Sequence, residues 1–279
     1  APKRPQIKND QIKVAFAGRP NVGKSSLVNA LFGTKKLIVS DVAGTTRDAI
    51  DLQVEYSGKK FTLIDTAGLR KRGKIEYGIE KLSSFRTLQA IERSDITCLL
   101  IDYKEGLKSQ DMHISSYILE ASKGLILVVN KSDLMKDKEK DENRMISMFK
   151  RKFDYLPWAP VVFISAINKT NIQQIFKLAN QIYEERFKQI DEEQLQLYLQ
   201  EITSKHQAPM MGRIKIKFAE IKQASVNPPT FDIWCNDPEK IHFSYERYLE
   251  NKIREKFGFN GTSIRIYFKL KNIRTKKKL

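Results

Sequence analysis

One segment limits the possible folds more than any other, the run Gly18-Arg19-Pro20-Asn21-Val22-Gly23-Lys24-Ser25. It fits the pattern G-x-x-x-x-G-K-S between a β-rich run and a helical run, which is the setting of a phosphate-binding loop. The backbone N–H groups of such a loop surround phosphate oxygens. Lys24 would bring positive charge to the β- and γ-phosphates, and the Ser25 hydroxyl would be a ligand of Mg²⁺. We therefore expect all eight residues to bind a nucleotide and Lys24 to be catalytic.

Short apolar runs alternate with helical stretches between residues 12 and 190. This alternation is typical of an α/β domain with a mostly parallel sheet. We interpret the polar residues 1–11, rich in Pro and Lys, as a linker, and residues 191–279 as a small α+β domain with a basic C-terminal tail. The expected strands of the first domain are 12–17, 50–56, 60–65, 97–102, 125–130 and 161–164. In the second domain we expect strands at 214–218, 231–234 and 264–270, and a helix at 245–257.

Two further segments are suited to sensing a γ-phosphate and a metal. In Asp65-Thr66-Ala67-Gly68, which follows an expected strand, the carboxylate of Asp65 can hold Mg²⁺ through water and the N–H of Gly68 can reach the γ-phosphate. Thr46, within Gly44-Thr45-Thr46-Arg47-Asp48, can complete the metal shell. We predict Ser25, Thr46 and Asp65 as Mg²⁺ ligands, Thr46 and Gly68 as catalytic residues, and Asp65, Thr66, Ala67 and Gly68 as nucleotide contacts.

A third pair of segments indicates which base is bound. Asn130-Lys131-Ser132-Asp133 ends an expected strand, and its Asp133 can accept two hydrogen bonds from the ring N–H and exocyclic amine of guanine. Adenine offers no such pair of donors, so a buried Asp133 would reject it. Ser165-Ala166 can present a backbone N–H to the guanine carbonyl. The predicted guanine-binding residues for GTP or GDP are Asn130, Lys131, Asp133, Ser165 and Ala166.

Charge and composition narrow the functional class. Fifty Lys and Arg against 33 Asp and Glu give a formal net charge of +17, which favours a polyanionic partner such as nucleic acid or an anionic membrane surface. The apolar runs fall far short of the roughly 20 residues that span a bilayer, so we expect no membrane-spanning segment. Two cysteines, Cys98 and Cys235, cannot build a disulfide framework or a Cys-only zinc site. We expect a reducing, cytoplasmic location.

Taken together, the segments Gly18–Ser25, Gly44–Asp48 and Asp65–Arg70 resemble those of the Era, MnmE and Der group of GTPases. The C-terminal part, with Pro228-Pro229-Thr230-Phe231 and Phe243–Leu249, is similar to the Der (EngA) family of bacterial ribosome-assembly GTPases. This resemblance covers essentially the whole chain. It implies a second GTPase domain and a KH-like domain, with the partner first GTPase domain missing from this chain. Departures are Ala43, where Der usually has Pro, and Ser132, where many relatives have a larger residue. Unlike Era, the second domain is expected to lack the G-x-x-G loop of ordinary KH domains.

The rate of hydrolysis depends on what orients the attacking water. Leu69 stands where a Ras-type enzyme has Gln and cannot hydrogen-bond water, so we expect slow intrinsic hydrolysis. The resemblance implies that Asn21 helps to bind K⁺ beside the phosphates, which would neutralise developing charge; the alternative is that Asn21 only shapes the loop. The basic run Arg70–Lys74 is either a contact for RNA or a solvated, mobile loop that orders with the γ-phosphate.

The resemblance also implies a ribosomal subunit and rRNA as partners. Candidate contacts alternate on one face of the last strand, Arg265, Tyr267, Lys269 and Lys271, and lie on the preceding helix, Arg247, Lys252, Arg254 and Lys256. The simpler interpretation is a solvated basic surface. We expect a monomeric, Mg²⁺-dependent GTPase switch acting in biogenesis of the large ribosomal subunit. The alternatives are a nucleotide-dependent docking module with negligible turnover and a tRNA-modification GTPase like MnmE; the Cys-free end Thr275–Leu279 disfavours the second.

Overall fold

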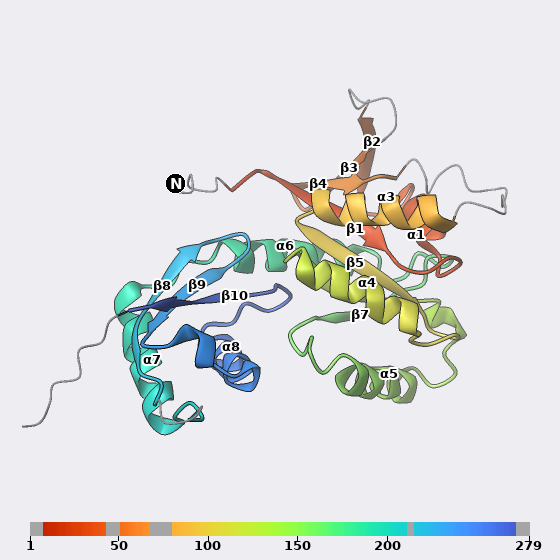
Figure 1. Ribbon diagram of the computed structural model, residues 1–279. Helices are drawn as coiled ribbons and strands as arrows, with labels where there is room; N and C mark the ends of the chain where they lie inside the picture. The colour runs from red at the N-terminus through yellow and green to blue at the C-terminus, as the bar shows by residue number, and fades with distance from the viewer. Residues whose placement is uncertain (1–7, 43–50, 67–79, 211–214, 272–279) are drawn as a thin grey trace, which may run out of the picture. The chain divides into compact units, whose positions relative to one another are not determined.

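The computed structural model describes residues 8–42, 51–66, 80–210 and 215–271 (Figure 1). The chain divides into two compact units. The larger unit holds Lys8–Glu184 together with Asn260–Thr262, and the smaller holds Glu185–Phe259 and the chain from Ser263 onward. The smaller unit thus begins a few residues before position 191, where the sequence suggests the second domain starts.

A seven-stranded sheet forms the centre of the larger unit, in the order β2-β3-β4-β1-β5-β6-β7. The strands β4, β1, β5, β6 and β7 run parallel, while β2–β3 and β3–β4 are antiparallel. This confirms the expected mostly parallel sheet. The strands span Gln11–Ala17 (β1), Ile38–Val42 (β2), Asp51–Tyr56 (β3), Lys59–Ile64 (β4), Ile96–Asp102 (β5), Gly124–Asn130 (β6) and Val161–Phe163 (β7).

The edge strand β2 has no counterpart among the expected strands. Its sequence, Ile38-Val39-Ser40-Asp41-Val42, holds no continuous apolar run, and Ile38 is 69% exposed. An edge strand is stabilised by pairing with one neighbour, here β3, and its side chains need not be buried. Hydrophobic patterning therefore carries little signal at this position.

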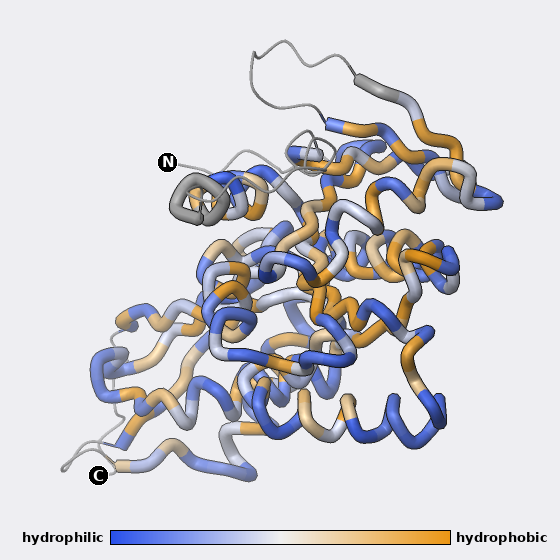
Figure 2. The backbone as a smooth tube through the Cα atoms, turned by 90° about the vertical axis from the view of Figure 1, so that its right-hand side faces the viewer, coloured by the Kyte–Doolittle hydropathy of each residue, from blue (hydrophilic) through white to orange (hydrophobic). Residues whose placement is uncertain are grey.

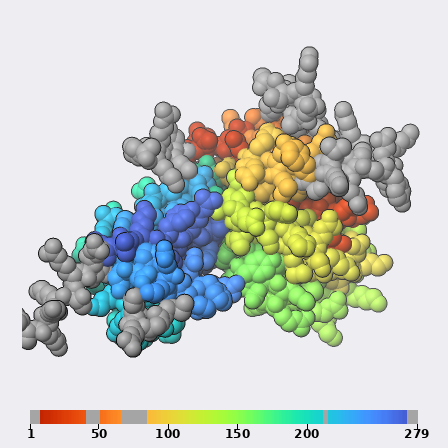
Figure 3. All heavy atoms as spheres, viewed as in Figure 1, coloured from red at the N-terminus to blue at the C-terminus, as the bar shows by residue number. Residues whose placement is uncertain are grey.

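Helices cover the sheet of the larger unit. They are α1 (Lys24–Leu31), α3 (Glu80–Arg93), α4 (Ser109–Glu120), α5 (Lys138–Lys152) and α6 (Gln173–Phe187), with a 3₁₀ turn η1 (Ser132–Leu134). Every residue of β5 and β6 is buried, as expected for strands covered on both faces. Figure 2 shows hydrophobic and hydrophilic stretches alternating along the backbone. Leu99 and Leu127 share a core with Ile91 of α3, Ile118 of α4 and Phe149 of α5. These three helices form a continuous outer surface in Figure 3.

The smaller unit is an α+β structure, as expected. Its sheet has the order β10-β9-β8, with β8 (Phe218–Ser225) antiparallel and β10 (Arg265–Leu270) parallel to β9 (Thr230–Cys235). The helices are α7 (Glu192–Lys205) and α8 (Phe243–Phe257), with a 3₁₀ turn η2 (Pro238–Lys240). The apolar stripe of α8, which is Tyr245, Leu249, Ile253 and Phe257, is buried against the sheet.

One detail of the smaller unit differs from the expectation. The strand predicted for 214–218 is wrong, because β8 begins at Phe218, where that strand was expected to end. Only Ile221 of β8 is buried, so the strand carries almost no apolar pattern. It is held instead by Gln196 of α7, whose side chain bonds the backbone of Ala219 and Ile221 at 3.0 and 3.1 Å. Leu270, at the end of β10, is 67% exposed.

No helix among the described residues is both long enough and apolar enough to cross a membrane.

Candidate nucleotide-binding site

The loop between β1 and α1 is closed by two glycines that other residues cannot replace. Gly18 has φ +143°, and a Cβ there would lie 2.6 Å from the carbonyl oxygen of Leu100 in β5. Gly23 has φ +98°, and a Cβ there would lie 2.1 Å from Nδ2 of Asn130 in β6. Left-handed backbone and the missing side chain both favour glycine. The loop is therefore pressed against the ends of the two central strands, and α1 begins directly after it with its N-terminal N–H groups beside the loop.

Lys24 folds back over this loop. Its Nζ donates to the carbonyl oxygens of Gly18 and Arg19, each at 2.6 Å. The positive charge is thereby fixed at the loop whose backbone N–H groups are suited to phosphate oxygens. The geometry suits the contact with the β- and γ-phosphates that the sequence predicts for Lys24.

Asn130 joins the phosphate loop to the loop after β7. The side chain is 2% exposed. Its Nδ2 donates to the carbonyl oxygen of Val22 at 2.9 Å, and its Oδ1 accepts from the backbone N–H of Ala166 at 3.1 Å. The amide of Asn130 thus joins the phosphate loop to the loop after β7; its predicted contact with the nucleotide stays a prediction.

Asp133 lies on η1, directly after Ser132, and is paired with the neighbouring loop. The hydroxyl of Ser165 donates to its Oδ1, and the N–H of Ser132 donates to the carbonyl of Ile164 at 3.0 Å. Asp133 is exposed, so its carboxylate is open to a bound base. Rejection of adenine would rest on the two hydrogen bonds that guanine, and not adenine, can donate to this carboxylate.

Asp65 directly follows β4, the strand that pairs with β1. It has φ +55°, and its N–H donates to Oδ1 of Asp51 at 2.9 Å, while Oδ2 of Asp51 accepts from Arg93 at 2.6 Å. These contacts fix the backbone that carries the Asp65 carboxylate. Because neighbouring parallel strands end at the same sheet edge, Asp65 and Ser25 lie at one edge. Thr66 is fully buried.

The donor set fits Mg²⁺. Mg²⁺ is usually held by one or two protein oxygens together with substrate phosphates rather than by a cage of side chains. Ser25 and Asp65 supply a hydroxyl and a carboxylate, and no cluster of three or more His, Cys, Asp or Glu that could hold a metal occurs in the described part of the chain. The predicted residues Thr46, Ala67 and Gly68, together with Leu69 and the basic run Arg70–Lys74, lie outside the described residues.

The connection from β5 to α4 belongs to this site although no motif marks it. Oδ2 of Asp102, 2% exposed, pairs with Nζ of Lys131 at 2.5 Å, and Oδ1 accepts from the N–H of Lys104 at 2.8 Å. Burial acts to raise the pKa of Asp102, but the bonds from Lys131 and from the N–H groups of Lys104 and Glu105 outweigh it and lower the pKa. Asp102 thus holds Lys131 in place. In the sequence, the only indication of this role was that Asp102 is a carboxylate placed directly after the apolar run 96–101.

Arg19, expected among the nucleotide contacts, directs its side chain elsewhere. Its guanidinium bonds Glu105, Gly106 and Asp111 of the same β5–α4 connection and the first turn of α4. Only the backbone of Arg19 therefore remains suited to a bound phosphate.

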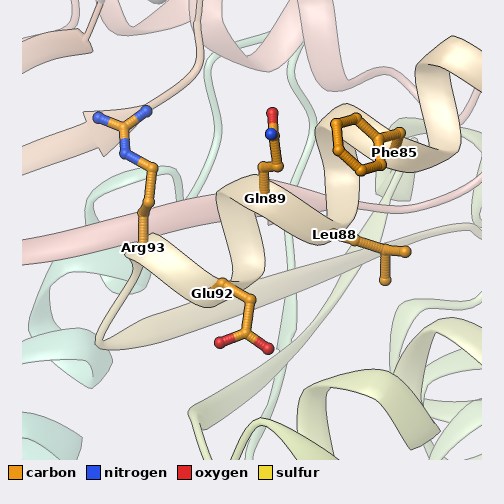
Figure 4. Close-up of a pocket in the computed structure, with 5 residues that line it drawn as sticks. All are labelled: Phe85, Leu88, Gln89, Glu92 and Arg93. Carbon is orange, nitrogen blue, oxygen red and sulfur yellow. The ribbon is translucent and has the colours of Figure 1, made fainter.

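A separate surface pocket is lined entirely by α3 (Figure 4). Its lining residues are Phe85, Leu88, Gln89, Glu92 and Arg93. None of the predicted nucleotide-binding residues lines it, so we do not assign the nucleotide to this pocket.

Comparisons with known proteins agree with this geometry. Residues 13–131 match the family model of the 50S ribosome-binding GTPase, and residues 189–269 match that of the KH-domain-like C-terminal region of EngA bacterial GTPase enzymes. GTPase Der of Listeria welshimeri is 43% identical over 258 residues, which are 92% of this chain and 59% of that protein. GTPase Der of a Geobacillus species is 44% identical over 271 residues, 95% of this chain and 61% of that protein. The chain belongs to the Der (EngA) family of GTPases.

The match includes the C-terminal KH-like region of Der, so the larger unit corresponds to the second GTPase domain. The chain spans about three fifths of the length of these Der relatives. Among solved structures, Era in complex with MgGDPNP and nucleotides 1506–1542 of 16S ribosomal RNA is similar over 93% of each chain, with 24% identity and a TM-score of 0.48.

The Der-like smaller unit does not present its basic residues on one face. Ile266 and Phe268 pack toward the core beneath α8, so Tyr267 and Lys269, which alternate with them, face the other side of the sheet. The candidate RNA contacts of β10 therefore lie on the face of the sheet that points away from α8. Several of the cations are also paired with acids: Lys269 with Asp232, Lys271 with Glu220, Lys252 with Glu255, and Arg254 with Glu250.

The turn between α8 and β10, whose residues Asn260–Thr262 belong to the larger unit, also corrects the expectation about a G-x-x-G pattern. Gly258-Phe259-Asn260-Gly261 matches it literally. However, this turn links α8 to β10, whereas the RNA clamp of a KH domain needs an exposed G-x-x-G loop. Phe259 is fully buried, the N–H of Gly261 donates to the carbonyl of Trp158 at 2.9 Å, and its carbonyl accepts from Leu125 at 2.8 Å. The backbone of Gly261 is occupied by protein contacts, so the turn is not built as an RNA clamp.

Proposed function

We propose that this chain binds GTP and GDP with Mg²⁺ and hydrolyses GTP as a molecular switch. One observation carries the proposal: the amide of Asn130 bonds both Val22 of the phosphate loop and Ala166 beside the guanine-selecting residues. This contact supports a single site made of phosphate and base segments that are more than 100 residues apart in sequence. Membership of the Der family supports the same assignment.

Each residue has a distinct part in this proposal. Lys24 neutralises the β- and γ-phosphates, and charge placed beforehand at the leaving and transferred groups lowers the barrier. Asp133, oriented by Ser165, accepts hydrogen bonds from guanine, and Ala166 offers its N–H to the guanine carbonyl. Mg²⁺, held by Ser25 and Asp65, supplies further positive charge when bound. We propose that Thr46 and Gly68 report the γ-phosphate.

Slow hydrolysis in Na⁺ and faster hydrolysis in K⁺ are expected. Leu69 cannot orient water, so another positive charge is needed near the phosphates. Asn21 is exposed on the phosphate loop with φ +63°, where its side chain is suited to help hold a monovalent cation. GTP hydrolysis measured in KCl and in NaCl at equal ionic strength should differ at least several-fold, and Asn21→Ala should remove the difference. Equal rates for the parent chain would rule out this part of the proposal.

We further propose that the switch acts in biogenesis of the large ribosomal subunit through rRNA, as a cytoplasmic monomer. The net charge of +17 and the match to the 50S ribosome-binding GTPase model support a ribosomal partner. In the smaller unit, Tyr267 is 49% exposed beside Lys269, which lies 5.3 Å over the Trp234 ring. Because protein contacts occupy the backbone of Gly261 in the G-x-x-G turn, electrostatic docking on structured RNA is favoured over clamping of a single strand.

Co-sedimentation with ribosomal subunits tests this assignment. We expect more chain to sediment with the large subunit in a non-hydrolysable GTP analogue than in GDP, and the bound fraction to fall steeply as salt rises, because phosphate contacts release counterions. Equal binding to the large subunit in GDP and in the GTP analogue would contradict the switch model. If the subunits bind the GTP form but do not accelerate hydrolysis, the docking-module alternative suggested by Leu69 is the better account.

A further inference from the structure

The guanidinium of Arg19 is one of the most fully bonded cations in the larger unit. Nε donates to both carboxylate oxygens of Asp111, at 2.9 and 3.0 Å. The two terminal nitrogens donate to Oε2 of Glu105 at 2.7 Å and to the carbonyl of Gly106 at 3.1 Å. All three nitrogens therefore contact one short stretch of chain, the end of the β5–α4 connection and the first turn of α4.

The partners of Arg19 differ in burial. The Arg19 side chain is 11% exposed and that of Asp111 is fully buried, whereas Glu105 is 48% exposed. Asp111 is also fixed from its own side, because Oδ2 accepts from the N–H of Lys108 at 3.0 Å at the start of α4. Burial raises the pKa of Asp111, so this carboxylate depends on its partners to stay ionised. The ion pair of Arg19 with Asp111 is therefore buried and fixed, whereas its ion pair with Glu105 is exposed to solvent.

The backbone of Arg19 faces the opposite way, toward the catalytic lysine. Its carbonyl oxygen accepts from Nζ of Lys24 at 2.6 Å. A chain of contacts therefore leads from Asp111 to the Arg19 side chain, through the Arg19 backbone, to the Lys24 ammonium. A lysine at position 19 could not reproduce this, because only guanidinium offers donors in a planar fork.

We propose that Asp111 and Arg19 are positioning residues for Lys24: the pair anchors the first half of the phosphate loop to α4 and so fixes the carbonyl that holds the Lys24 ammonium at the β- and γ-phosphates. This inference rests on the proposed function of the loop. It assigns a part in phosphate recognition to a helix that carries no nucleotide motif.

The pair has a measurable consequence for GTP chemistry. If the anchor is lost, the loop can still form between β1 and α1, but the position of Lys24 becomes less defined, and small misplacement of a catalytic group is costly. We expect Arg19→Ala and Asp111→Ala each to weaken GDP binding by about tenfold and to lower kcat at saturating GTP by a similar factor. The double variant should bind GDP and hydrolyse GTP no less well than the more impaired of the two single variants, because each single substitution already removes the same link.

The test combines four variants with two kinds of readout. The variants are Arg19→Ala, Arg19→Lys, Asp111→Ala and the double alanine variant, and Arg151→Ala, an exposed arginine on α5, is the control. GDP affinity and kcat are measured alongside thermal unfolding without nucleotide. Arg19→Lys guards against misfolding, since it keeps the charge and most of the volume, and it should still lose affinity and kcat. Arg151→Ala should behave as the parent chain.

Two results would overturn the inference. One is GDP affinity and kcat within twofold of the parent for Arg19→Lys and Asp111→Ala, even if the melting temperature falls, since the pair would then only stabilise the fold. The other is additive losses in the double variant, which would show that the two side chains act separately. Failure of the parent chain itself to bind GDP would instead refute the proposed function.

Discussion

Replacing Lys24 by methionine is expected to lower kcat for GTP hydrolysis by about 100-fold or more and to weaken GDP binding strongly. Methionine keeps the length of the side chain but removes the ammonium that Gly18 and Arg19 hold over the phosphate loop. Loss of a single pre-placed donor to a charged transition state typically costs about 100- to 1,000-fold in kcat. The fold should survive, since an apolar chain of similar volume replaces a half-buried one.

The measurement is phosphate release under saturating GTP, together with equilibrium titration of GDP. Lys150→Met is the matched control, because Lys150 is an exposed lysine of α5 that belongs to none of the predicted nucleotide segments. It should hydrolyse GTP at the parent rate. Hydrolysis by Lys24→Met within a few-fold of the control would show that this ammonium does not act on the phosphates.

Replacing Asp133 by asparagine is expected to change the preferred base from guanine to xanthine. The parent carboxylate accepts from the ring N–H and the amine of guanine, whereas an amide in its place can accept from the ring N–H and donate to the carbonyl that xanthine has at the amine position. Each hydrogen bond to a charged group is worth about 1.5–3 kcal/mol. In Asp133→Asn one of these bonds is lost and the exocyclic amine of guanine faces the NH₂ group of the asparagine. GDP binding should therefore weaken by at least about 100-fold, while binding of xanthosine diphosphate should become tighter.

Competition between GDP and xanthosine diphosphate on parent and variant chains measures this change directly. Asp154→Asn, an equal loss of charge at an exposed residue after α5, is the control and should keep the preference for GDP. If Asp133→Asn retained that preference, the base would have to be recognised elsewhere, and the assignment of Asp133 would be wrong.

The sequence predicted the phosphate loop because this loop requires a backbone conformation that only certain residues can adopt. A phosphate loop needs glycine at Gly18 and Gly23 whatever surrounds it, and the contacts of those positions with Leu100 and Asn130 show why. The parallel sheet was equally predictable, because strands covered on both faces, such as β5 and β6, must be continuous apolar runs.

Sequence patterns do not predict the contacts that single polar residues make with partners distant in the sequence. Asp102 and Asp111 are isolated carboxylates in the sequence, and their partners Lys131 and Arg19 lie 29 and 92 residues away. Only the packing of the β5–α4 connection against both nucleotide segments reveals their part. The bonds by which the buried amide of Asn130 joins two loops were likewise not predictable from the sequence pattern.

In the smaller unit, the sequence pattern carried no information on which cations share a surface or pair with acids. The alternation placed Tyr267 and Lys269 on one face of the last strand, and the sheet turns that face away from α8. Arg254, counted among the RNA contacts, bonds Glu250 at 2.7 Å and the carbonyl of Phe259 at 2.8 Å instead. A count of charged residues in the sequence does not show which cations are paired with acids in the fold.

Titration calorimetry of the unaltered chain with GDP and, in parallel, ADP in Mg²⁺ tests the central claim most directly. A single site built from the phosphate loop, Asn130 and Asp133 should bind one GDP per chain and prefer it to ADP by at least about 100-fold, given two hydrogen bonds that adenine cannot make. Equal affinity for the two nucleotides, or no heat with either, would contradict it.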